Sequence, residues 1–162
     1  MLHPERYFSS DPEIRKIGLE LYNNVKDFPI LSPHGHVEAS VFSENKPFPD
    51  PANLIIVPDH YVIRMLYSHG IEMEKLGVPT IVGERSQEDS RKIWQIFANH
   101  YYLFAGTPTG IWLRDEFEGV FGVDKKLTGE SAMEIYDLIQ EKLQTPEFLP
   151  RALFDQFKIE VL

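Results

Sequence analysis

The sequence of 162 residues contains no cysteine, which excludes disulfides, thiol catalysis and cysteine metal ligands. Basic residues are also scarce: 16 Lys and Arg stand against 25 Asp and Glu, so the formal net charge is −9. An acidic chain is poorly suited to nucleic acid, whose binding depends on counterion release from phosphates. No apolar run approaches the roughly 18 residues of a membrane span, and the N-terminus lacks a signal-peptide core. We therefore expect a soluble, cytoplasmic protein with no nucleic-acid or membrane partner.

Several sequence motifs of common enzymes are absent as well. There is no GxGxxG, no P-loop, no GxSxG and no HExxH, so the corresponding nucleotide-binding, hydrolase and protease functions have no support. What is present is 43% hydrophobic residues with 12% aromatics, which is enough for a packed core of one domain.

Hydrophobic periodicity predicts more helix than strand. Trp94, Trp112 and the run His100-Tyr101-Tyr102 lie at core spacing, so aromatic packing is expected for them. The run at 55–57 is too short to distinguish strand from helix. A loop is expected over 79–86. Strands are predicted over 28–33 and 158–162, and helices over 11–26, 59–68, 88–104, 111–120, 130–144 and 145–157.

The sharpest local signal is His34-Gly35-His36, directly after the apolar strand. Two histidines at i and i+2 on an extended segment point the same way, so both imidazoles can reach one metal ion. Imidazole suits zinc, iron, nickel or copper. A third ligand would have to come from Glu38, His60 or elsewhere. The alternative is a pair of surface histidines without a ligand.

The second candidate is Asp59-His60-Tyr61, followed by Arg64. A histidine such as His60 can donate or accept a proton in catalysis, and the Tyr61 phenol can hydrogen-bond to a sugar hydroxyl or a carbonyl. At a helix start these side chains would lie at an open end. In the alternative interpretation Asp59 only caps the helix, Tyr61 is half-buried and His60 is solvated.

The segment 158–162 reads as an alternating strand at the end of the sequence. Two interpretations are open on pattern alone. The segment is either an edge strand that completes a small sheet or the beginning of a strand in a fold that continues further.

At these positions the sequence resembles the uronate isomerases (glucuronate isomerases) of the amidohydrolase superfamily. The histidine pair alone is shared by many metal-dependent hydrolases, whereas its combination with Asp59-His60-Tyr61 and Arg64 is far more specific. One departure is Ala39, where the family usually has proline. The matching positions also include Leu21-Tyr22, Val25-Lys26-Asp27, Pro29-Ile30, Gly70, Trp112, Phe121-Gly122-Val123 and Ile159-Glu160-Val161.

The resemblance implies an α/β fold, namely the N-terminal fragment of a distorted (β/α)₈ (TIM) barrel. The fragment would contain the first strand and a mainly helical insertion, so the chain itself would be mostly α. We expect residues 1–49 to hold the N-terminal helix and strand 1, residues 50–145 the helical insertion, and residues 146–162 the return helix and the start of strand 2. Family members run to several hundred residues, which favours the second interpretation of the 158–162 segment.

The resemblance also implies an aldose–ketose isomerase. D-Glucuronate would be interconverted with D-fructuronate, and D-galacturonate with D-tagaturonate, by proton transfer through an enediol. His34 and His36 would bind a divalent metal, most simply Zn²⁺. His60 and Tyr61 would be catalytic and substrate-binding, with Arg64 as a weaker substrate contact or a structural residue. The fragment alone should be nearly inactive.

Two alternatives remain at this point. One is another metal-dependent hydrolase of the same superfamily, which would share the histidine pair but not the Asp59-His60-Tyr61 stretch. The other is a non-enzymatic helical interaction module, in which the two strands would pair only with each other and leave no large apolar face. Uncovered strand edges would instead favour association of the isolated chain, including a homo-oligomer.

Overall fold

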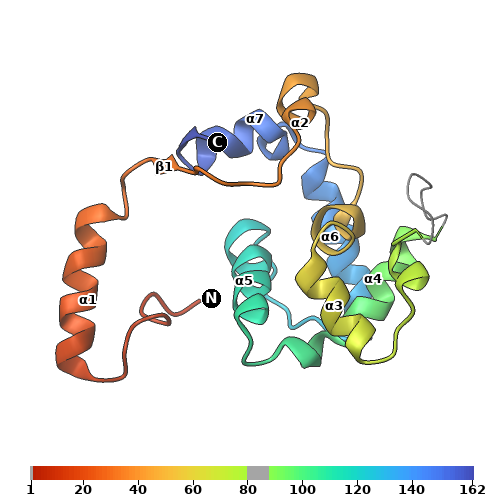
Figure 1. The fold of residues 1–162 in the computed structure, drawn as a ribbon, viewed down its shortest axis with the longest axis horizontal. Coiled ribbons are helices and arrows are strands. Elements are labelled where there is room, and N and C mark those ends of the chain that lie inside the picture. The colour runs from red at the N-terminus through yellow and green to blue at the C-terminus, as the bar shows by residue number, and fades with distance from the viewer. Residues whose placement is uncertain (1, 80–87) are drawn as a thin grey trace. The chain divides into compact units, whose positions relative to one another are not determined.

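The computed structural model describes residues 2–79 and 88–162, and this part of the chain is mostly helical with little sheet (Figure 1). Apart from Pro79, the loop expected over 79–86 lies outside the described residues. The chain divides into two compact units. We call Met1–Lys46 with Pro146–Leu162 the strand unit, and Pro47–Thr145 the helical unit. Within the described ranges no helix has the length and apolarity needed to cross a membrane.

The strand unit holds a short parallel pair of strands. The backbone N–H of Ile30 donates to the Lys158 carbonyl at 2.8 Å, and that of Ser32 donates to the Val161 carbonyl at 2.8 Å. Both predicted strands are therefore confirmed, although each is shorter than expected, and the structure pairs them in parallel. Helices α2 and α7 pack against each other in this unit (Figure 1). Its elements are α1 (Pro12–Val25), β1 (Ile30–Leu31), α2 (Ala39–Glu44), η5 (Pro146–Phe148), α7 (Pro150–Gln156) and β2 (Ile159–Val161).

The helical unit contains the main aromatic core. Trp94 and Phe97 are fully buried, and the Trp94 indole N–H donates to the Ala132 carbonyl at 2.8 Å, so burial leaves no unpaired indole donor. Helix α4 packs against α6 and η1. The elements of this unit are η1 (Ala52–Ile56), α3 (His60–Ser68), η2 (Met73–Leu76), α4 (Ser90–Asn99), η3 (Tyr101–Phe104), α5 (Pro108–Asp115), η4 (Glu116–Val120) and α6 (Ala132–Leu143).

Side-chain caps determine where several helices begin. Asp11, Asp59 and Asp89 each accept backbone N–H groups of the first turn of α1, α3 and α4. Thr107 does the same for α5, with the Gly110 N–H donating to its hydroxyl at 3.0 Å. A cap of this kind satisfies amide donors that have no partner inside the helix. The starts of α1 and α3 follow the predicted positions for this reason.

Some predicted helix boundaries are wrong. The helix expected over 88–104 ends at Asn99, because the chain turns into the 3₁₀ segment η3. The helix expected over 111–120 already begins at Pro108 and widens to a π-helix from Glu116. The ambiguous run at 55–57 is helical, since η1 covers its first two residues. Helix α2 was not anticipated.

The expectation of core packing holds for Trp94 but is wrong for Trp112 and Tyr102. Trp112 is 54% exposed and Tyr102 is 61% exposed. Helical spacing places a side chain on one face, but it does not say whether another element covers that face. Trp112 instead packs its ring against a second exposed aromatic, Tyr61.

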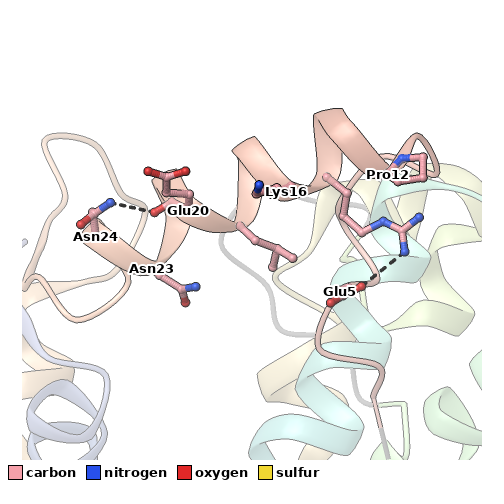
Figure 2. A pocket seen from close by; sticks show the side chains of 8 residues that line it. Glu5, Pro12, Lys16, Glu20, Asn23 and Asn24 are labelled. Carbon is pink, nitrogen blue, oxygen red and sulfur yellow. Dashed lines mark hydrogen bonds and ion pairs between the residues drawn. The ribbon is translucent and has the colours of Figure 1, made fainter.

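Helix α1 has an exposed apolar face and a polar side. No residue of α1 is buried. The polar side borders a shallow hollow together with the N-terminal segment (Figure 2). There the Arg15 guanidinium pairs with Glu5 at 3.4 Å, and the Asn24 amide donates to the Glu20 carbonyl at 2.8 Å. None of the predicted site residues lines this hollow.

Candidate functional site

The histidine pair lies in the strand unit, immediately after β1. Ser32 at the end of the strand donates from its hydroxyl to the His34 carbonyl at 2.8 Å, which holds the turn that leads into the pair. The Nε2 atoms of His34 and His36 are 3.1 Å apart, and both residues are exposed. A hollow of about 450 Å³ adjoins His34 and is also lined by Phe42, Phe154 and Glu160.

The distance between the two ring nitrogens fits a shared metal ion. Nitrogens bound at about 2.0–2.1 Å to one tetrahedral zinc lie about 3.4 Å apart. Without a metal, the same 3.1 Å separation is a hydrogen bond between the two rings, with one ring donating and the other accepting. No group of three or more His, Asp or Glu suited to a metal is found across residues 2–79 and 88–162. The pair thus supplies two convergent donors of the right chemistry.

The second candidate lies at the start of α3 in the helical unit. One carboxylate oxygen of Asp59 accepts the backbone N–H of Tyr61 at 2.7 Å and that of Val62 at 3.2 Å. His60 and Tyr61 are both exposed, and their ring centroids are 4.2 Å apart. Asp59 therefore caps the helix, as the alternative interpretation of this segment expects. The cap also presents His60 and Tyr61 together at an open helix end.

Trp112 from α5 adds a third ring to this group. Its centroid lies 6.2 Å from that of Tyr61, at an interplanar angle of 72°. Edge-to-face contacts of this kind favour a defined ring orientation. Arg64, one turn beyond His60 on α3, is exposed, and no partner for it is found among the described residues. A guanidinium in that position is suited to a carboxylate ligand.

Glu116, the first residue of η4, is the unexpected ionisable group of the helical unit. Desolvation by the surrounding protein, followed by the charges of Asp59 and Asp115, raises its pKa to about 7. The residue is nevertheless exposed, so its carboxyl group can exchange protons with solvent. A carboxyl group that titrates near neutral pH is suited to holding or transferring a proton.

Sequence reasoning missed Glu116 and misassigned Trp112. The two residues are four apart, which predicts that they share one helix face. Nothing in the sequence, however, connects that face with Asp59 and Tyr61, some fifty positions earlier. Their proximity depends on how α5 packs near the start of α3.

Comparison with known proteins identifies a family whose model matches most of the chain. The family model described as glucuronate isomerase matches residues 9–162. The uronate isomerase of Brucella canis is 45% identical over 161 residues, and that of Xanthomonas euvesicatoria pv. vesicatoria is 48% identical over 161 residues. Each alignment covers 99% of this chain and 34% of the relative. The chain therefore spans about a third of the length of the curated relatives it matches.

Solved structures give the same result. The crystal structure of glucuronate isomerase from Caulobacter crescentus matches with a TM-score of 0.95 and 45% identity, covering 100% of this chain and 34% of that one. The uronate isomerase of Thermotoga maritima matches with a TM-score of 0.82 and 29% identity, covering 100% of this chain and 33% of that one.

Proposed function

Because this chain belongs to the glucuronate isomerase family, we propose that it forms part of an enzyme that interconverts aldose and ketose hexuronates. The substrate pairs are D-glucuronate with D-fructuronate and D-galacturonate with D-tagaturonate. The match over residues 9–162, with the histidine pair inside it, is the observation that carries the proposal. Since the chain spans 34% of its relatives, the activity is proposed for a protein of their full length. The 162 residues alone are expected to be nearly inactive.

The proposed architecture is the N-terminal part of a distorted (β/α)₈ barrel. The parallel pairing of β1 with β2 supports it, because parallel neighbours need a long crossover connection, here a mainly helical one. In such barrels, active-site groups follow the carboxyl ends of strands, which is where His34 and His36 lie after β1. A cytoplasmic location and a homo-oligomeric form belong to the same proposal.

His34 and His36 are proposed to hold a divalent metal, most simply Zn²⁺. The support is the 3.1 Å separation of two exposed, convergent imidazole nitrogens. When bound, the metal would act as a Lewis acid that polarises a substrate oxygen. The histidines themselves would contribute neutral donor nitrogens, so binding should weaken when they are protonated.

His60 and Tyr61 are proposed to contact the sugar oxygens or to assist the proton transfer. Aldose–ketose isomerisation moves a proton between C2 and C1 and places negative charge on oxygen in the enediol intermediate. The Tyr61 phenol would donate a hydrogen bond to that oxygen, and His60 would accept or return a proton. Both side chains are exposed and adjacent, as these roles require. Arg64 is proposed as a weaker contact for the sugar carboxylate.

The proposal is tested in a chimera. The matched third of the Caulobacter crescentus enzyme is replaced by this chain, which is 45% identical to it, and D-fructuronate formation from D-glucuronate is measured. We expect an active chimera. Tyr61→Phe and His60→Asn should each lower kcat by roughly 10²–10⁴-fold, the usual contribution of general acid–base groups. His34→Ala with His36→Ala should lose activity together with bound metal.

Lys46→Gln is the matched control, because Lys46 is exposed in a loop of the strand unit. It should retain the activity of the parent chimera. A chimera that folds and binds metal but does not isomerise D-glucuronate would refute the proposal. Isomerisation that persists at full rate in Tyr61→Phe would remove the catalytic role of that residue. Vigorous turnover by the 162-residue chain alone would contradict the expected inactivity.

A further inference from the structure

Two histidines outside the proposed active site lie close together in the helical unit. His69 follows the last residue of α3, and His100 follows the last residue of α4. Their ring centroids are 5.7 Å apart, at an interplanar angle of 64°. Tyr102 of η3 completes a triangle, because its ring centroid lies 6.4 Å from that of each imidazole. Tertiary packing thus gathers three side chains with nitrogen or oxygen donor atoms at one place.

One of the two imidazoles is already held in a form that can bind a metal. The Nδ1 atom of His100 is 2.8 Å from the carbonyl oxygen of Ile96. Since a carbonyl only accepts, Nδ1 carries the proton and donates this bond, and the lone pair of the neutral ring is on Nε2. Metal-binding histidines almost always make a second hydrogen bond of this kind, which fixes the tautomer and the orientation of the ring. His100 therefore offers Nε2 as a donor atom.

The separations within the group suit a single ion. The Tyr102 hydroxyl oxygen lies 3.4 Å from the Nε2 atom of His69, and two donors on one tetrahedral zinc ion are about 3.4 Å apart. Two imidazoles on such an ion have ring centroids about 5 Å apart, so the rings of His69 and His100 need to approach each other by only a fraction of an ångström. His69 and Tyr102 are exposed, which lets both side chains adjust and lets an ion enter from solvent.

The electrostatics of this place also favour a cation. Both imidazoles lie at helix C-termini, where the partial negative charge of the backbone carbonyls stabilises a positive ion. Neither α3 nor α4 has a Lys or Arg in its last turn to supply that charge. We propose that His69, His100 and Tyr102 form a second binding site, for a divalent transition metal of the kind that imidazole prefers, with Zn²⁺ as the probe. The ligands are the two Nε2 atoms and the phenol oxygen, and water completes the coordination.

Zinc titration of the 162-residue chain carrying His34→Ala and His36→Ala tests this site, because that background lacks the other histidine pair. Isothermal titration calorimetry should detect one zinc ion per chain, and the bound ion should raise the melting temperature by linkage. Adding His69→Ala or His100→Ala should weaken binding by more than about tenfold, the loss that removal of even an outer partner of a ligand produces. Tyr102→Phe should weaken binding less, because a phenol is a poorer ligand than an imidazole at neutral pH.

His3→Ala is the matched control in the same background. His3 is also an exposed histidine, but it belongs to the strand unit, and its replacement should leave the zinc affinity unchanged. Absence of zinc binding, or an affinity unaffected by His69→Ala or by His100→Ala, would overturn the proposal. Equal affinity in Tyr102→Phe would overturn the assignment of the phenol as a ligand.

Imidazole ¹⁵N resonances in that background provide a measurement that needs no substitution at the site itself. Zinc should shift the Nε2 resonances of His69 and His100 together, while Nδ1 of His100 keeps its proton and its bond to the Ile96 carbonyl. Bound zinc that leaves these two resonances in place would refute the site even if every variant fails to fold. Since no turnover is measured and His34 and His36 are absent, these outcomes are independent of the chimera assay, and either proposal can fail alone.

Discussion

At the residue scale, the pKa values of two carboxyl groups in the helical unit are shifted in opposite directions. Partial desolvation and the charges of Asp59 and Asp115 raise the pKa of Glu116 to about 7, whereas the hydrogen bond from Arg114 lowers the pKa of Glu118. The two carboxyl groups lie two positions apart in the sequence and so provide a matched pair. Proton linkage then predicts opposite effects of pH on the stability that each contributes.

Glu116→Gln should stabilise the chain at pH 8.5 relative to pH 5. The folded-state pKa of Glu116 lies above its unfolded value, so its favourable contribution is complete below the unfolded pKa and is lost as the pH rises through about 7. Glutamine does not titrate, and the variant should gain at most about 1 kcal/mol, because solvent screens a partly exposed carboxyl. Urea unfolding followed by tryptophan fluorescence at both pH values measures the difference.

Glu118→Gln is the control for that experiment. Its folded-state pKa is lowered, so its contribution is present above the unfolded pKa and is lost as the pH falls through the folded value. The control variant should therefore show no gain at pH 8.5. An equal gain in both variants would indicate a general effect of net charge rather than a specific site at Glu116.

At the scale of elements, the junction of η3 and α5 depends on a glycine. A Cβ at Gly110 would collide with the carbonyl oxygen of Phe104. The same carbonyl accepts the Thr107 hydroxyl at 2.7 Å, so the backbone on both sides is already held. Close approach of two backbone segments is a use of glycine that no other residue can replace.

Gly110→Ala should destabilise the helical unit by about 1–3 kcal/mol, the usual cost of forcing extra volume into a packed position. Thr109→Ala, the neighbouring change, should have a smaller effect, because it adds no atom. Thermal unfolding monitored by circular dichroism compares the two variants. Equal melting temperatures for Gly110→Ala and the parent chain would mean that the junction can shift at little cost.

The helices also differ in how well the spacing of their apolar residues predicts them. Helix α6 was expected from the spacing of its apolar residues, and its inner face is buried as expected, with Ile135, Tyr136, Ile139 and Leu143. The break after Asn99 was not predictable in the same way. The residues on both sides of it keep helical spacing, and Phe97 and Phe104 both reach the core through the change to a 3₁₀ segment.

At the scale of the whole molecule, large apolar side chains remain exposed in the strand unit. Ile14, Ile17 and Leu21 on one face of α1 are 59–65% exposed, and Leu31 of β1 is 63% exposed. A self-contained interaction module would need a closed core, which this exposure does not provide. Exposed apolar faces of this kind favour association of the isolated chain.

The isolated chain should therefore associate in solution. Light scattering on dilution should show mass that rises with concentration, and Leu21→Glu should reduce it by placing a charge in the apolar face of α1. Asn23→Glu adds the same charge on the polar side of the helix and should leave association unchanged (Figure 2). A wild-type chain that stays monomeric at all concentrations would contradict the expectation.

The sequence by itself determined the local features of this protein. Capping residues, helical periodicity and the strand before His34-Gly35-His36 act over a few positions, so α1, α6, both strands and the family were predictable from the chain. Only the tertiary structure decided which faces are covered. It left Trp112 exposed against Tyr61, and it brought Glu116 under the influence of Asp59. Burial and charge proximity arise from packing between distant segments, and these terms set the pKa of Glu116 near neutrality.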